Sequence, residues 1–315
     1  MTTISIGISA CLQGKKVRYD GSSKRGLHLF KQLDEHINLE PVCPEMSIGL
    51  GVPRETIRLV GTVDNLQLTD SKDQSINHTN AMTTFAHQYS QSHRHIAGYI
   101  GVKQSPSCGF DRVKRYTEKG HAAAQDTQGL FIQSLLKHSP LLPIEEDGRL
   151  NDAPIRENFI TRVYTYHEWL DLEASGITHK KLQDFWSRHK YSLMAHDITA
   201  YQQAGRLLAN HKGQPLDNIA NEFITIVMQG LKKIATRKLH ANVLHHIAGY
   251  LKRDLSSPDK QELHQLIHSY RCQEVPLIVP MTMLKHHFKH HNSSYIDRQH
   301  FMNPYPDNLA LRNSL

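Results

Sequence analysis

Three short apolar segments of this chain are each followed by a cysteine, and this recurrence constrains the fold more than any other feature. Residues 4–9 run into Cys11, residues 39–42 into Cys43, and residues 96–102 into a turn that contains Cys108. If the segments are parallel strands of one sheet, their carboxyl ends share the edge where open α/β sheets form ligand sites. The pattern therefore predicts that three cysteines far apart in sequence meet in space.

The residues up to about 155 alternate between strand signals and helix signals. Such alternation predicts a mostly parallel, covered sheet, Rossmann-like or flavodoxin-like. Residues 57–60 and 65–68 alternate apolar with polar side chains, which indicates a half-exposed hairpin. The remaining expected strands are 4–8, 39–42, 96–102 and 141–144, and the expected helices are 21–36, 80–93 and 125–137.

From residue 167 onward the apolar periodicity becomes that of long helices, which predicts an all-α second half. Residues 153–162 form the expected transition, so we predict domains at 1–160 and 161–315. Asp259 follows a proline and precedes Glu262 by three residues, which indicates a helix cap. The expected helices are 180–210, 216–239, 241–255, 259–272 and 280–291.

Composition narrows the class of protein. A chain of 315 residues with 39% hydrophobic and 21% charged residues has room for two soluble domains. It has no apolar stretch long enough to span a bilayer, and its first residues do not resemble a signal peptide, so we expect a cytoplasmic protein. The net charge of +7 suits an anionic or nucleic-acid partner.

Four cysteines in a chain of this length do not make a disulfide framework. Spacing alone leaves three readings open, because there is no CxxC motif and the gaps are long. The cysteines hold a metal or an iron–sulfur cluster, or they are buried structural thiols, or one of them is a nucleophile.

The segments around these cysteines resemble the ordered motifs of the thiouracil desulfurase family over residues 4–160. The one departure is Met-Ser-Ile at 46–48, where the family is usually richer in glycine. The matching motifs are Cys-Leu-Gln-Gly at 11–14 with Val-Arg-Tyr-Asp-Gly at 17–21, Cys-Pro-Glu at 43–45 with Gly-Leu-Gly-Val-Pro-Arg at 49–54, Lys-Gln-Ser-Pro-Ser-Cys-Gly at 103–109, and Arg-Glu-Asn-Phe at 156–159.

The resemblance implies a cofactor and a reaction. The cofactor is a [4Fe-4S] cluster on three cysteines, carried over here to Cys11, Cys43 and Cys108, with one iron open to substrate. The reaction is non-redox hydrolysis of a C–S bond, which converts 2-thiouracil or a related thiolated base to uracil and sulfide.

Chemistry then suggests roles for residues beside these ligands. Glu45 is the candidate to activate water or shuttle protons, against a reading as a solvated or capping carboxylate. Ser105 and Ser107 are candidates to bind the pyrimidine edge or deliver a proton, although serines in such turns often satisfy the local backbone. Lys103 is the candidate to hold negative charge near the cluster, against a reading as a solvated lysine.

A second group of residues is expected to line the pocket on the substrate side. Arg18, Tyr19 and Asp20 belong to the first motif and lie close to Cys11 in sequence. Asp20 followed by glycine is also an ordinary turn signal.

The segments 185–196, 242–250 and 276–280 of the helical half resemble a second family of unknown function, and the similarity covers residues 165–305. The resemblance implies an all-α domain and does not indicate an activity. His189 and His196 lie seven residues apart and therefore share one helix face. They are candidates for metal ligands or for an anion site, against a reading as ordinary core or surface histidines. The histidines and lysines of 285–291 form a basic face that can meet nucleic acid or simply be solvated. Cys272 lies outside the three motifs and is expected to be a non-ligand.

Two other functions remain open at this stage. One is an RNA-associated protein that acts on thiolated bases in tRNA through its basic helical half. The other is a non-catalytic iron–sulfur sensor. The sequence also leaves a homo-oligomer open.

Overall fold

The computed structural model describes residues 3–24, 36–210 and 213–315. The helix expected at 21–36 therefore falls largely outside the described residues. The chain divides into two compact units, Met1–Asn151 and Asp152–Leu315. The division lies just before a long helix, α5 (Ala153–Ala174), whereas the expected boundary at 160 and the expected transition at 153–162 fall inside that helix.

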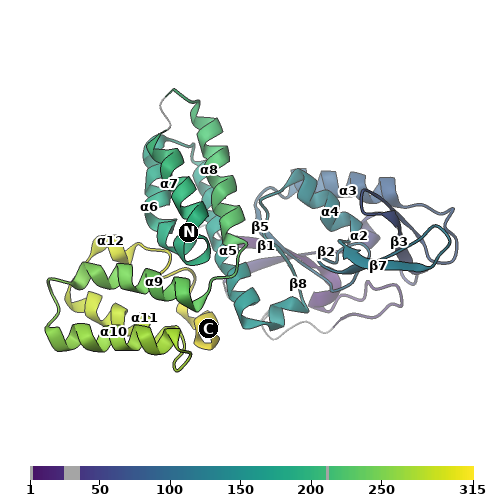
Figure 1. The fold of residues 1–315 in the computed structure, drawn as a ribbon. Helices are drawn as coiled ribbons and strands as arrows, with labels where there is room; N and C mark the ends of the chain where they lie inside the picture. Colours follow the sequence, from purple (N-terminus) through teal and green to yellow (C-terminus); the bar gives the residue numbers. More distant parts are fainter. Residues whose placement is uncertain (1–2, 25–35, 211–212) are drawn as a thin grey trace. The chain divides into compact units, whose positions relative to one another are not determined.

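The first unit is built on a four-stranded parallel sheet with the order β2-β1-β5-β8 (Figure 1). Its strands are β1 (Ile4–Ser9), β2 (Ile37–Val42), β5 (Ile96–Gly101) and β8 (Ile144–Glu146). Every residue of β1 and β5 is buried, which explains their continuous apolar sequences. The parallel sheet confirms the predicted fold class. The direction of winding reverses between β1 and β5, which makes their carboxyl ends the expected ligand position.

Helices α3 (Thr79–Ser92) and α4 (Leu130–His138) lie side by side and pack on the sheet (Figure 1). The ring of Phe131 lies 5.5 Å from the rings of both Tyr89 and Tyr99. Tyr99 belongs to β5, so this aromatic contact fixes the helices above the strand that leads to Cys108.

A second sheet has the order β4-β3-β6-β7. The hairpin of β3 (Ile57–Thr62) and β4 (Asn65–Asp70) confirms the one predicted at 57–68. The hairpin of β6 (Val113–Tyr116) and β7 (Ala122–Thr127) was not predicted. The expected helix 125–137 was wrong at its start, because residues 125–127 pair with β6 and α4 begins at Leu130. The strand expected at 141–144 is displaced to 144–146.

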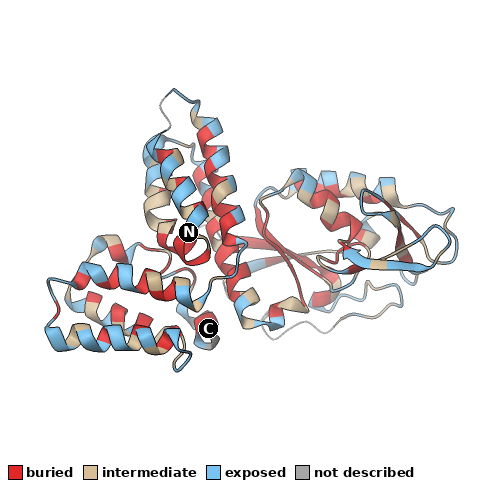
Figure 2. Cartoon of the chain, in the orientation of Figure 1, coloured by how far each residue is buried: buried red, intermediate tan, exposed pale blue. Residues whose placement is uncertain are grey.

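The second unit is all-α, as predicted. Besides α5 its helices are α6 (His179–His196), α7 (Ile198–Ala209), α8 (Leu216–Leu231), α9 (Arg237–Ala248), α10 (Ser257–Arg271), α11 (Ile278–His290) and the short α12 (Ser294–Asp297). Their buried residues face inward and their outer faces are exposed (Figure 2). Among the described residues, no helix combines the length and apolarity that a membrane span requires.

Several helix boundaries differ from those that periodicity suggested. The expected helix 180–210 is two helices, because the Asp197 carboxylate accepts hydrogen bonds from the N–H groups of Thr199 and Ala200 and starts α7. The expected helix 216–239 ends at Leu231. The cap of α10 is Ser256 rather than Asp259, whose N–H donates to the serine hydroxyl.

Candidate functional site

The three cysteines of the first unit line one cavity of about 290 Å³ at the carboxyl ends of the strands. Cys11 lies in a 3-10 turn directly after β1, and Cys43 lies directly after β2. Cys108 ends the turn that follows β5 and is 6% exposed. The structure thus brings together side chains that are separated by 32 to 97 residues in sequence.

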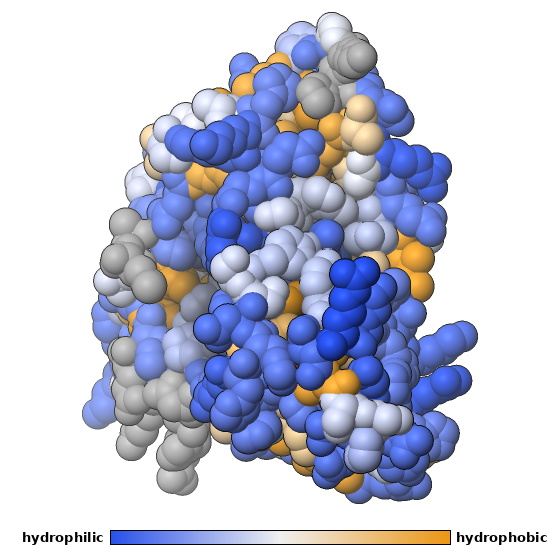
Figure 3. All heavy atoms as spheres, turned by 90° about the vertical axis from the view of Figure 1, so that its left-hand side faces the viewer, coloured by the Kyte–Doolittle hydropathy of each residue, from blue (hydrophilic) through white to orange (hydrophobic). Residues whose placement is uncertain are grey.

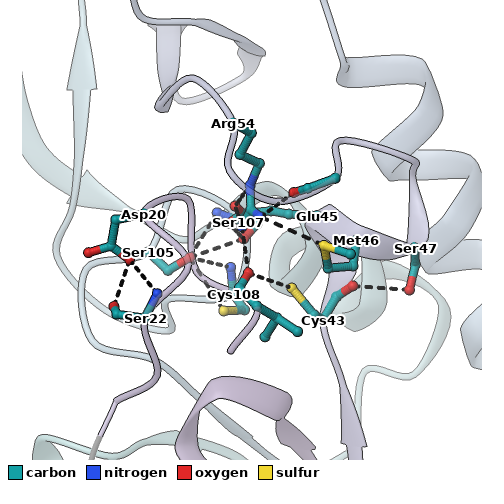
Figure 4. Close-up of polar contacts among 12 residues, drawn as sticks. Asp20, Ser22, Cys43, Glu45, Met46, Ser47, Arg54, Ser105, Ser107 and Cys108 are labelled. Carbon is teal, nitrogen blue, oxygen red and sulfur yellow. Dashed lines mark hydrogen bonds and ion pairs between the residues drawn. The ribbon is translucent and has the colours of Figure 1, made fainter. Parts of the chain in front are cut away.

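The turn before Cys108 is shaped by hydrogen bonds to one serine (Figure 4). The Ser105 hydroxyl accepts from the backbone N–H groups of Ser107 and Cys108 at 3.3 and 3.2 Å. Two glycines let other backbone segments approach this turn. A Cβ on Gly129 would lie 2.4 Å from the Ser107 carbonyl oxygen, and one on Gly101 would lie 2.0 Å from that of Cys108.

The environment of the thiols resists ionisation. Burial raises the pKa of Cys11 to about 12, and the neighbouring Cys108 and Cys43 add to the increase. Burial also raises the pKa of Cys43, and Glu45 and Cys108 add to that increase. Ionising Cys11 and Cys43 side by side is therefore unfavourable without a partner, and a bound cationic centre removes the penalty because coordinated thiols are deprotonated.

The donor set bears on the kind of metal group that the cavity can hold. Three cysteine thiols line it. Cysteine thiolates are the standard ligands of iron–sulfur clusters, so these residues fit such a cluster.

A buried ion pair forms one wall of the cavity (Figure 4). The Glu45 Oε2 atom accepts from Arg54 Nε at 3.0 Å and from Nη2 at 2.5 Å, and the Ser107 hydroxyl donates to Oε1 at 2.6 Å. The side chains of Arg54 and Glu45 are 6% and 14% exposed. Arg54 also donates to the carbonyl oxygens of Gly51 and Val17.

The capping reading of Glu45 does not describe this arrangement, because both carboxylate oxygens are bound to side chains. The Ser105 hydroxyl satisfies the local backbone, whereas the Ser107 hydroxyl donates to Glu45. The two hydroxyls lie 3.0 Å apart. The sequence did not predict a role for Arg54 in the site, although this residue ends the second cysteine motif.

The other expected residues divide between cavity and surface. Arg18, Tyr19 and Lys103 line the cavity. Asp20 is not part of the lining, and its carboxylate accepts from the backbone N–H and hydroxyl of Ser22, so the ordinary turn reading holds for it. Lys24, which sequence analysis missed, also lines the cavity.

The histidines singled out in the helical unit do not act as a pair. His196 Nδ1 lies 2.6 Å from the Lys233 carbonyl oxygen, while His189 Nε2 lies 3.1 Å from Glu168. Both are buried, but they belong to different networks. Cys272 is exposed and lies 3.4 Å from His268 Nε2, in the helical unit rather than in the cavity of the first unit.

The fold and site define a two-unit protein with a cysteine-lined cavity at one edge of a four-stranded parallel sheet. The chain matches the 2-thiouracil desulfurase family over residues 6–147 and a family of unknown function, DUF1722, over residues 190–306. The first match lies within the amino-terminal unit and the second within the helical unit.

Two individual proteins are similar to parts of the chain. The uncharacterized protein YbgA of Escherichia coli (strain K12) is 31% identical over 159 residues, which are 50% of this chain and 94% of YbgA. The solved structure of a [4Fe-4S]-dependent thiouracil desulfidase, TudS, is 23% identical, with a TM-score of 0.37 over 47% of this chain and 93% of TudS.

Proposed function

We propose that the amino-terminal unit is a [4Fe-4S]-dependent desulfurase that hydrolyses the thiocarbonyl of 2-thiouracil or a related thiolated base to uracil and sulfide. The observation that carries the proposal is the convergence of three cysteines on one cavity beside a buried carboxylate. The match to the 2-thiouracil desulfurase family supports the substrate class.

In this proposal Cys11, Cys43 and Cys108 hold the cluster, whose fourth iron, without a protein ligand, supplies a Lewis acid for the thiocarbonyl sulfur. The side chains of Arg18 and Lys103 add positive charge to the cavity, which favours an anionic pyrimidine. Tyr19 lines the same cavity with 43% of its surface exposed, so its ring is available to stack on the base.

Glu45 is the proposed proton acceptor for the attacking water. The oxygen of water adds to the thiocarbonyl carbon while Glu45 takes one of the two water protons. The C=O bond then forms as the C–S bond breaks, and sulfur leaves with the second proton as hydrosulfide. The carboxylate is oriented for this role by Arg54 on one oxygen and by the Ser107 hydroxyl on the other. Ser105 extends this chain of hydrogen bonds to the backbone of Cys108.

The proposal is tested with the full chain, reconstituted with iron and sulfide under anaerobic conditions. We expect about four irons per chain and release of uracil from 2-thiouracil, followed by chromatography. Cys108→Ser is expected to abolish uracil release and lower the iron content, whereas Cys272→Ser, at an exposed cysteine of the helical unit, leaves both unchanged. An iron-free reconstituted protein, or equal uracil release by Cys108→Ser, contradicts the proposal.

A second candidate function places the thiolated base within RNA. The helical unit carries 20 basic and 15 acidic residues, while the first unit is closer to balance with 17 and 15. Lys285, Lys289 and Arg312 line a cavity of about 840 Å³ in this unit. The side that faces the viewer in Figure 3 is mostly hydrophilic, with apolar residues in separate patches.

Thiolated tRNA and free 2-thiouracil distinguish these candidates when both are given to the same enzyme. Activity on tRNA alone, with binding that weakens steeply as salt rises, favours the RNA substrate. A protein that keeps its iron but releases no product from either substrate is instead an iron–sulfur sensor.

A further inference from the structure

Three side chains from separate segments of the helical unit converge away from the cysteine cavity. Glu168 lies on α5, His189 on α6, and His300 follows α12. Their carboxylate and imidazole ligand atoms all lie within 4.8 Å of one another, and this is the only such cluster among the residues that the structure describes. None of these three residues belongs to the cysteine motifs or to the basic segment 285–291.

Both imidazoles direct Nε2 at the same carboxylate. His189 Nε2 lies 3.1 Å from Glu168 Oε2, and His300 Nε2 contacts Oε1. The two rings are stacked, with 3.9 Å between their centroids and 18° between their planes. Phe185 stacks on His189 at 4.0 Å, and the backbone N–H of His300 donates to the Arg188 carbonyl oxygen. These contacts hold the Nε2 atoms of both histidines toward the Glu168 carboxylate.

The protonation states suit a cation. Burial lowers the pKa of His189 to about 3, and the charge of His300 adds to the effect, so His189 is neutral at pH 7. Burial opposes ionisation of Glu168, but hydrogen bonds from both histidines outweigh it and hold its pKa well below the usual range.

The carboxylate is also reachable from outside. Its side chain is 29% exposed and lines a surface depression whose other charged residues are Asp171, Asp184, Lys180, Lys181 and Arg188. Arg188 donates to Glu168 Oε2 at 2.6 Å and competes with a cation there. Asp184 binds the same guanidinium at Nε, which reduces that competition by sharing the positive charge.

We propose that Glu168, His189 and His300 bind a divalent transition-metal ion of the zinc class, with water in the remaining position. Two imidazoles and one carboxylate are a donor set that zinc takes in proteins when it keeps a fourth position open. The ion replaces the two N–H···O hydrogen bonds with nitrogen–metal–oxygen links, and each imidazole then carries its proton on Nδ1. The site ties α5, α6 and the segment after α12 together.

The test uses the full chain with its iron–sulfur cluster loaded, treated with a chelator and then titrated anaerobically with zinc chloride. We expect one tightly bound zinc per chain and a higher melting temperature of the helical unit. Zinc X-ray absorption should show only nitrogen and oxygen neighbours at about 2.0–2.1 Å, whereas zinc on thiols shows sulfur at about 2.3 Å.

Matched variants locate the ion. His300→Gln and Glu168→Gln should lower zinc affinity at least tenfold and remove the thermal shift. His264→Gln removes an exposed histidine from the same unit, and Cys272→Ser removes a thiol beside His268, and both should bind zinc as the unaltered chain does.

Three results overturn the proposal: no bound zinc, sulfur among its neighbours, or unchanged affinity in His300→Gln. Circular dichroism checks the fold of each variant. If a variant fails to fold, the zinc X-ray absorption spectrum of the unaltered chain decides whether the ion has only nitrogen and oxygen ligands. Uracil release is not a readout, so the outcome is independent of the proposed desulfurase activity.

Discussion

Replacing Glu45 by glutamine separates its charge from its shape. The amide can still accept from Arg54 through its oxygen and donate to the Ser107 hydroxyl, which now accepts. The hydrogen bonds at 2.5 to 3.0 Å are therefore largely kept, while the negative charge is lost. Any change in stability or turnover then reports the carboxylate charge.

The cost follows from the burial of the pair. With Arg54 only 6% exposed, the variant leaves a guanidinium nearly out of water without its counter-charge. Removing one partner of a buried pair costs 3–5 kcal/mol. The carbonyl oxygens of Gly51 and Val17 still accept from Arg54, so we expect the lower end, about 3 kcal/mol, or roughly a hundredfold in the folding equilibrium. Loss of the proton acceptor lowers turnover by about 10²- to 10⁴-fold.

The assay combines anaerobic urea unfolding, iron content and uracil release from 2-thiouracil. Iron content should stay the same, because Glu45 is not an expected ligand. Glu55→Gln is the control, since the Glu55 side chain is 52% exposed in its ion pair with Lys72 and should change stability by less than about 1 kcal/mol. If Glu45→Gln loses stability but keeps turnover within a few-fold, Glu45 serves only as the partner of Arg54.

Two further predictions concern the backbone and pH. Gly129→Ala places a Cβ 2.4 Å from the Ser107 carbonyl oxygen, so the iron content after reconstitution should fall. In the control Gly249→Ala the added Cβ meets nothing within 4 Å, so the iron content should not change. Equal iron content in the two variants refutes the packing argument. Burial lowers the pKa of His240 well below 6.5, so the unfolded state binds its proton first and stability is lost as pH falls below 6.5. Between pH 7 and pH 5.5, a histidine that stays neutral in the folded state lowers the free energy of unfolding by about 1.2 kcal/mol. Urea unfolding of His240→Gln should therefore show a smaller decrease over this pH range, by that amount. A decrease equal to that of the unaltered chain contradicts the prediction.

Local sequence was a good guide where a segment's neighbours did not alter its preference. The fully buried β1 and β5 read as strands because both faces are apolar, and the hairpin of β3 and β4 read from its alternation. By contrast, the alanines at 122–124 favour a helix on their own and form a strand only because β6 offers a hydrogen-bonding edge. Likewise, Asp197 interrupts a long apolar periodicity by capping the next helix.

The sequence alone determined that cysteines follow the ends of apolar strands, and from this their convergence could be predicted. It did so because the apolar composition of each segment, and the cysteine that follows it, are local properties that a linear pattern records. Only the tertiary structure decided that Arg54 neutralises Glu45, that Asp20 turns away from the cavity, and that Glu168 meets His189 and His300. Those contacts depend on how separate segments pack, and packing distances do not appear in the spacing of residues along a chain.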